Sequence, residues 1–251
     1  MPTTIPSTTS STRPGSPSTG DAYFETDTKN YIIYDGANWI LYNNNGSAGD
    51  QYLQFDGTDK ATIADSASLQ VTGDLSICCW FNLDNTSGIQ ALVAKRDSGG
   101  ANYVLYVNHT SGKLTSFDGS SLIADTTALS SGTWYHGAVV IDSGTSTKFY
   151  INGSLSSTGA SSTISADDAD LLFGQDTFGS DFEGKLDDVA IYNRILTASE
   201  VTDIYQGTYA SSGLIGKWTI LGDTGTTITD SSTNSNNGVL SATGMIKAGS
   251  R

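Results

Sequence analysis

The chain between Gln51 and Gly207 consists of strand-length apolar runs separated by turns rich in Gly, Asn, Asp and Ser. Within YVLYVN, the side chains of Tyr103, Leu105 and Val107 share one face, because successive side chains alternate across a β-strand. About nine runs follow this pattern without a proline: YLQF, LSICCWF, ALVAK, YVLYVN, KLTSFD, WYHGAVVI, KFYING, LLFGQ and KLDDVAIY. The pattern predicts an all-β fold, a two-sheet antiparallel sandwich.

The alternation in LSICCWF also predicts to which face each of its two cysteines points. Leu75, Ile77, Cys79 and Phe81 share one face, whereas Cys78 points to the other. Neighbouring cysteines on opposite faces are poorly placed to pair with each other. The sequence therefore predicts two buried free thiols.

One short helix is predicted at the end of the strand-rich region, in TASEVTDIYQG. Thr197 is followed three residues later by Glu200, which is the spacing of a capping box, and Gly207 ends the segment. The apolar stripe of this helix consists of Val201, Ile204 and Tyr205.

The N-terminal part differs in composition. All four prolines lie within the first seventeen residues, and eleven of the first twenty residues are Ser or Thr. Such a segment cannot bury a core, which predicts an extended arm over residues 1–19 that is ordered by contacts with another chain. Residues 20–46 contain the runs AYFET, YIIYD and WILYN, which predict a small three-stranded meander with Gly36 and Asn38 in its turns.

The charge of the chain argues against nucleic acids as partners. The 251 residues include 26 acidic and 12 basic side chains, a net charge of −14, and no cluster of Lys and Arg, which argues against nucleic-acid binding.

No apolar run approaches the roughly 20 residues that span a bilayer. The N-terminus lacks the basic start and apolar stretch of a signal peptide. We therefore expect a soluble protein that folds in a cytoplasm and does not bind membranes.

The stretch TRPGSPSTGDAYFETDTKNYIIYDGANWILY resembles a recurring module of tailed-bacteriophage virion proteins. In that module a Pro/Ser/Thr lead precedes GDxYFxTDTxxxxxYDGxxW. The resemblance implies that residues 1–46 attach the chain to other virion proteins, at the capsid or the tail. It also implies location in the virion and self-association, for which a trimer is one arrangement.

Three later strings resemble, in order, a laminin-G-like, concanavalin A-type jelly roll. They are YLQFDGTDKATIADSASLQVTGDLSICCWF, GTWYHGAVVIDSGTSTKFYINGSL and LLFGQDTFGSDFEGKLDDVAIYNRILTASEV. The resemblance implies a jelly-roll sandwich over residues 47–251, in a family that mainly binds carbohydrate or protein.

The order of one segment departs from this family. Its usual opening strand and DSSGNxNxG turn are matched by GLIGKWTILGDTGTTITDSSTNSNNGVL at 213–240, after the helix. Chain ends in sandwiches are often close together, so a permuted opening strand can fill its place in the same chain. Insertion into a neighbouring subunit and the start of a lost repeat are the alternatives.

The fold family includes glucanases, which need two carboxylates about 5 to 10 Å apart. Their Glu-x-Asp-x-Glu strand is absent, and the three Glu residues fall in separate predicted elements: Glu25, Glu183 and Glu200. The Asp pairs at 167–168 and 187–188 would face opposite ways in strands. His109 and His136 are interpreted as structural residues, and no G-x-S-x-G elbow is present. We expect no enzymatic activity.

A calcium site is the candidate cofactor chemistry. KRDSGGANYVLYV and FGQDTFGSDFEG resemble the two loop segments that hold calcium in pentraxin-type relatives. The resemblance implies Asp97, Gln175, Asp176 and Asp181 as ligands, and carboxylate and amide oxygens suit this hard cation. The alternative is that these are solvated turn residues.

The function expected from these features is a non-enzymatic virion protein of a tailed phage, acting in capsid decoration, as a head fibre or in the tail. Its jelly roll would bind host-surface glycans or stabilise the particle. A free glycan-binding lectin or adhesin is the alternative, and a glycan hydrolase is the third. Trp80 and Trp134 lie in strand patterns and are expected in the core, while Trp39 and Trp218 are expected to seal the added pieces. No glycan-binding residue is predicted.

Overall fold

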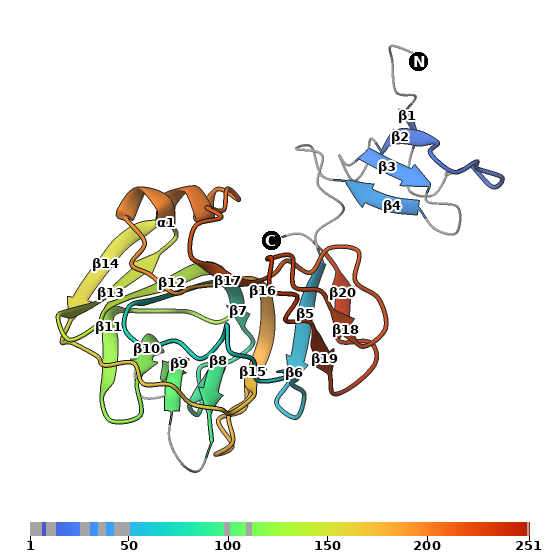
Figure 1. The fold of residues 1–251 in the computed structure, drawn as a ribbon. Coiled ribbons are helices and arrows are strands. Elements are labelled where there is room, and N and C mark those ends of the chain that lie inside the picture. The colour runs from blue at the N-terminus through green and yellow to red at the C-terminus, as the bar shows by residue number, and fades with distance from the viewer. Residues whose placement is uncertain are drawn as a thin grey trace. The chain divides into compact units, whose positions relative to one another are not determined.

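A computed structural model describes residues 7–8, 14–25, 31–34, 39–42, 51–97, 101–108, 112–249 and 251 (Figure 1). The chain divides into two compact units. One comprises Met1–Tyr52 with Lys247–Arg251, and the other comprises Leu53–Ile246. This division lies a few residues after the boundary expected at 46/47, and the last residues of the chain belong with the N-terminal unit.

The N-terminal unit contains a four-stranded sheet in the order β1-β2-β3-β4. Its strands are β1 (Ser7–Thr8), β2 (Ala22–Glu25), β3 (Tyr31–Tyr34) and β4 (Trp39–Tyr42). The three antiparallel strands β2, β3 and β4 form the expected meander. The short β1 adds a parallel fourth strand from within the predicted arm. The predicted turn residues Gly36 and Asn38 lie outside the described residues.

The larger unit is built on two eight-stranded sheets. The first, the β9 sheet, has the order β11 (Leu122–Ala128), β10 (Lys113–Phe117), β9 (Ala101–Asn108), β8 (Gln90–Arg96), β15 (Leu171–Phe173), β6 (Ala61–Ile63), β19 (Gly238–Leu240) and β18 (Thr227–Ile228). The second, the β7 sheet, has the order β14 (Ser154–Gly159), β13 (Ser146–Ile151), β12 (Trp134–Asp142), β7 (Leu75–Leu83), β16 (Glu183–Tyr192), β5 (Gln51–Asp56) and β20 (Ile246–Ala248), and β17 (Leu214–Trp218) also pairs with β16.

The main core lies between these two sheets. Tyr103, Leu105 and Val107 belong to it, as the alternation along β9 predicted. The predicted inward face of β7 is confirmed in the same way: Leu75, Ile77, Cys79 and Phe81 all lie in this core. The antiparallel all-β sandwich predicted from the sequence is therefore confirmed.

Between residues 51 and 212, three strands of the sandwich were not among the nine predicted runs. They are β6, β11 and β14. Strand β6 has only three residues. Strands β11 and β14 carry mainly small or polar residues, and each is the last strand of its sheet. Edge strands of this kind lack the alternating apolar pattern that identifies buried strands.

The segment 213–240 pairs within its own chain. β17 is antiparallel to β16, and β19 is antiparallel to β6, so the segment contributes to both sheets. Trp218 is fully buried, and its ring meets Phe173 edge-on at a centroid distance of 5.1 Å.

Helix α1 (Ala198–Tyr205) has the predicted capping box, in which Thr197 and Glu200 each accept a hydrogen bond from the other's backbone. Its buried residues Val201 and Ile204 join Cys78 in a cluster on the outer face of the β7 sheet. Both cysteines are buried and free, as predicted, and burial raises the pKa of Cys78 to about 12. The described chain has no helix whose length and hydropathy would suit a bilayer span.

Candidate functional site

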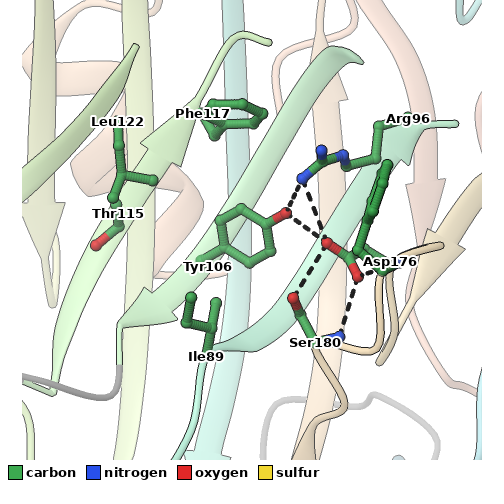
Figure 2. A pocket seen from close by; sticks show the side chains of 9 residues that line it. Ile89, Arg96, Tyr106, Thr115, Phe117, Leu122, Asp176 and Ser180 are labelled. Carbon is green, nitrogen blue, oxygen red and sulfur yellow. Dashed lines mark hydrogen bonds and ion pairs between the residues drawn. The ribbon is translucent and has the colours of Figure 1, made fainter. Parts of the chain in front are cut away.

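A pocket of about 400 Å³ lies on the outer face of the β9 sheet (Figure 2). Tyr106 follows the inward-facing Leu105 on β9 and therefore points away from the core. It packs in a separate outer cluster with Ala91, Val104 and Phe117. The pocket is lined by Ile89, Arg96, Tyr106, Thr115, Phe117, Leu122, Asp176, Phe178 and Ser180.

Asp176 is the polar centre of this pocket, and only 2% of it is exposed. Its Oδ1 accepts hydrogen bonds from the backbone N–H groups of Phe178 at 2.8 Å and Ser180 at 3.0 Å. Its Oδ2 accepts from the Tyr106 hydroxyl at 2.6 Å and the Ser180 hydroxyl at 3.1 Å. Arg96 Nη1 completes the set at 3.5 Å from Oδ2. The carboxylate is thus held by five donors, as the dashed lines of Figure 2 show.

Arg96 joins this polar centre to the aromatic part of the pocket. Nη1 also donates to the Tyr106 hydroxyl at 2.8 Å. The guanidinium carbon lies 4.1 Å from the ring centroid of Phe178 and 4.9 Å from that of Phe117, within the range of cation–π attraction. Two rings and one carboxylate therefore fix the position of the cation.

The rim of the pocket is apolar and exposed. Ile89 is 42% exposed, Leu122 55% and Phe178 58%. These three are among seven large apolar side chains exposed in the described part of the chain. Because exposed apolar groups gathered around a few polar ones mark ligand sites, this pocket is the candidate functional site.

The ionisation of the centre follows from its contacts. Burial works to raise the pKa of Asp176, but hydrogen bonds from Tyr106, Ser180 and Phe178 outweigh it, and the pKa lies below its ordinary value. For Tyr106, burial first and then its hydrogen bond to Asp176 raise the pKa. At neutral pH the centre is thus an ion pair between Asp176 and Arg96, bridged by a neutral phenol.

The structure does not gather the four predicted calcium ligands into one site. Asp176 is saturated by protein donors that include a guanidinium, and Gln175 donates to Asp181 at 2.6 Å. Asp97 lines a different hollow with Gln70, Ala166, Asp167 and Asp168. In the described ranges, no three Asp, Glu, His or Cys side chains form a group suited to a metal ion. These residues do not fit a calcium shell as they stand.

Calcium binding stays a prediction that melting experiments decide. If Asp97 is a ligand, micromolar calcium should raise the melting temperature of the chain, and Asp97→Ala should abolish the rise. Equal melting temperatures in calcium and in a chelator would remove the prediction.

Sequence reasoning missed most of the residues of this pocket. Arg96 and Tyr106 lie in the string quoted for calcium, and Phe178 lies between Asp176 and Asp181, but none was singled out. The turn that carries Asp176 starts at Gly174, whose φ is +83°. In this turn Asp176 contacts Arg96 of β8 and Tyr106 of β9. These contacts join segments that are distant in the chain, so no local sequence pattern shows them.

Among the described residues, those considered for catalysis come from several different segments of the chain. Glu183 begins β16, and Glu200 lies in α1. Asp167 and Asp168 lie outside any strand, which corrects the expectation that alternation separates them. At Asp187 and Asp188 a bulge and a φ of +49° at Asp188 break the alternation assumed for that pair. His136 is buried in β12, and His109 lies outside the described residues.

The comparisons agree with this architecture. The model of the concanavalin A-like lectin/glucanases superfamily matches residues 55–202. A candidate carbohydrate-binding protein from Bacteroides ovatus is similar in structure, with a TM-score of 0.66, 15% identity, and coverage of 92% of this chain and 70% of that one. No curated protein matches the sequence.

Two further solved structures have TM-scores of 0.51. A heptameric SAP-like pentraxin from Limulus polyphemus is 17% identical, with 78% of this chain and 96% of that chain covered. Domain 4 of an extracellular arabinanase from Geobacillus stearothermophilus, in complex with arabinotriose, is 21% identical, with 70% and 81% covered. These likenesses show the fold, and the family match covers more than half of the sequence. The chain therefore belongs to the concanavalin A-like lectin/glucanase superfamily.

Proposed function

We propose that the larger unit is a non-enzymatic glycan-binding module whose ligand occupies the Asp176 pocket. The observation that carries the proposal is the gathering of three exposed apolar side chains around the buried carboxylate of Asp176 and its ion pair with Arg96. Sugars bind to such surfaces because their C–H faces pack on aromatic rings while their hydroxyls exchange hydrogen bonds with fixed polar groups. The arabinotriose complex of the arabinanase domain supports a sugar as the ligand class.

The pocket favours a sugar that is neutral or carries an apolar substituent. Asp176 already balances the charge of Arg96, so an anionic ligand would meet a nearly neutral centre. The rim offers Ile89, Leu122 and Phe178 rather than further cations. A methyl or acetyl group on the sugar would fill this apolar part of the pocket.

The proposal is tested on a glycan array, followed by calorimetry with the strongest ligand. Phe178→Ala should weaken binding at least tenfold without unfolding the chain, because this side chain is 58% exposed. Leu155→Ala is the matched control, since Leu155 is 54% exposed but does not line the pocket. Equal affinity of both variants and the wild type would refute the pocket as the site.

The absence of activity is part of this proposal. Hydrolysis of a glycosidic bond needs two suitably spaced carboxylates. In the described pocket the single carboxylate is Asp176, which is engaged with Arg96. Incubation with the bound glycan should release no reducing ends, and their release would contradict the proposal.

We further propose that the chain is a virion component of a tailed phage, assembled in the host cytoplasm, attached to other virion proteins through residues 1–46 and present in several associated copies. The N-terminal resemblance and the separate N-terminal sheet support this role. Mass spectrometry of washed particles should detect the chain, and deletion of residues 1–46 should release it from them. A free lectin or adhesin is the alternative, and absence of the chain from washed particles would favour it.

A further inference from the structure

Arg96 brings an unused hydrogen-bond donor to the Asp176 pocket. Its Nη1 donates to the Tyr106 hydroxyl at 2.8 Å and lies 3.5 Å from Asp176 Oδ2. Its Nη2 has no hydrogen bond to the described residues, and unlike Nε it is not enclosed by them. Because the side chain is 18% exposed and lines the pocket, the two N–H groups of Nη2 are available to a ligand.

The direction of this donor is fixed by the pocket. The guanidinium lies over the rings of Phe117 and Phe178, and its Nη1 is held by Tyr106 and Asp176. A donor that is already held in place loses little conformational entropy when a ligand binds to it. Arg96 Nη2 is therefore suited to select an acceptor at one defined position.

The protein itself occupies most acceptors of the pocket. The Asp176 carboxylate accepts from five donors and is 2% exposed. Thr115 is fully buried, and its hydroxyl donates to Lys113 O at 3.1 Å. Ser180 is partly exposed, and its hydroxyl donates to Asp176 Oδ2 at 3.1 Å, so its oxygen can still accept. A ligand thus meets an open donor at Arg96 and an open acceptor at Ser180.

An acetamido group has the chemistry that this arrangement requires. Its carbonyl oxygen accepts and its N–H donates, whereas each sugar hydroxyl brings a donor that needs a further acceptor. Arg96 Nη1 and Ser180 Oγ lie beside the same atom, Asp176 Oδ2, so one small group can reach both residues. The methyl group can pack on the exposed apolar rim. The amide is also neutral, which suits a centre whose charges already balance.

We propose that the Asp176 pocket recognises the acetamido group of an N-acetylated amino sugar, which rests on the glycan binding proposed above. The carbonyl oxygen of the ligand accepts from Arg96 Nη2, and its amide N–H donates to Ser180 Oγ. Its methyl group packs on the rim beside Leu122. The pocket thereby distinguishes the acetylated from the unacetylated form of the same sugar.

The test is calorimetry on the full chain with pairs of matched sugars. Tri-N-acetylchitotriose is compared with cellotriose, and N-acetylgalactosamine with galactose. In at least one of these pairs the acetylated sugar should bind at least tenfold more tightly, because its partner lacks the hydrogen bond to a charged donor and the packed methyl group. O-acetylated xylotriose and xylotriose form a third pair, which carries the acetyl group without the amide N–H.

Two variants place the acetamido group in the pocket. Arg96→Lys keeps the positive charge but removes Nη2, and it should bind both sugars of a pair with similar affinity. Arg194→Lys is its control, since Arg194 pairs with Glu200 and does not line the pocket. Leu122→Ala should also reduce the preference, and it is expected to fold because Leu122 is 55% exposed. Leu155→Ala is the control for that change.

The possible results separate this proposal from the function on which it rests. If both sugars of each N-acetyl pair bind equally and Phe178→Ala weakens them, the pocket binds sugars but the acetamido assignment is wrong. A preference confined to the O-acetyl pair would also contradict it. A preference that survives in Leu122→Ala, and in Arg96→Lys where that variant folds, would place the acetamido group elsewhere. If no sugar binds, both proposals fail.

Discussion

Asp176 is held by backbone and side-chain donors from both β9 and its own turn, so its charge supports the structure as well as the pocket. Replacing it with Asn should cost about 1.5–3 kcal/mol of unfolding free energy, because hydrogen bonds to a charged group are lost and an NH₂ group faces other donors. Asp181→Asn is the control, since Asp181 accepts one hydrogen bond, from Gln175. Urea denaturation measures both, and equal losses would contradict this role for Asp176.

The ion pair of Arg194 with Glu200 makes a pH-dependent contribution. Hydrogen bonding to Arg194 lowers the pKa of Glu200 to about 2, from an ordinary value of 4.5. A depressed carboxyl pKa adds stability that is complete above pH 4.5 and is lost as the pH falls towards 2. Both side chains are about a quarter exposed, so the contribution is at most about 1 kcal/mol.

Glu200→Gln should therefore be less stable than the wild type at pH 7, and the difference should shrink as the pH approaches 2. Denaturation curves at pH 7, 4 and 2.5 give the comparison. A difference that stays constant over this range would show that the charge of Glu200 is not the cause.

At the scale of single elements, the turn after β15 depends on two glycines with similar backbone angles. Gly174 has a φ of +83° and Gly179 a φ of +81°, where other residues are strained. A Cβ at Gly174 would clash with the ring of Phe55, whereas a Cβ at Gly179 meets nothing within 4 Å.

Gly179→Ala should cost about 1–2 kcal/mol, for the backbone strain alone. Gly174→Ala should cost more, because Phe55 must also move. Thermal melting distinguishes the two, and the larger loss should be accompanied by weaker ligand binding at Asp176. Equal losses would mean that the core accommodates the added methyl.

Hydrogen bonds connect the edge strands of the two sheets. Asp125 of β11 is 2% exposed and accepts hydrogen bonds from Ser156 at 2.8 Å and Ser157 at 2.5 Å, both in β14. These contacts tie the last strand of one sheet to the last strand of the other. A buried charge at such an edge also hinders pairing with another chain.

For the whole molecule, the C-terminal segment completes both sheets. It provides β17 next to β16 and β19 next to β6, and it buries Trp218, Ile228 and Leu240 in the main core. A chain that ends at residue 212 should therefore fail to fold cooperatively, because two strands lose their partners and the core loses a tryptophan. Circular dichroism on heating measures this. Restoration by a peptide of residues 213–251 would support the assignment, and cooperative melting near the wild-type temperature without it would contradict it.

Local patterns in the sequence are sufficient for much of the sandwich. The inward faces of β7 and β9 follow from alternation, and the limits of α1 follow from Thr197, Glu200 and Gly207, because these features depend on residues close together in the chain. The weakly patterned β11 and β14 could not be found in this way. Trp80 and Trp134 are half-buried and lie outside the main core, so the interpretation of both as core residues was wrong. Strand alternation shows which side chains share a face, but not which of the two faces packs in the core.

The sequence by itself determined the fold class, the helix and its caps, the buried cysteines and the acidic character of the chain. Only the tertiary structure decided that Arg96, Tyr106, Asp176 and Phe178 share one pocket. These residues come from β8, β9 and the turn after β15, which are separated along the chain and meet through sheet pairing and the turn at Gly174. Contacts of that kind arise from packing between distant segments, so no local spacing of residues records them.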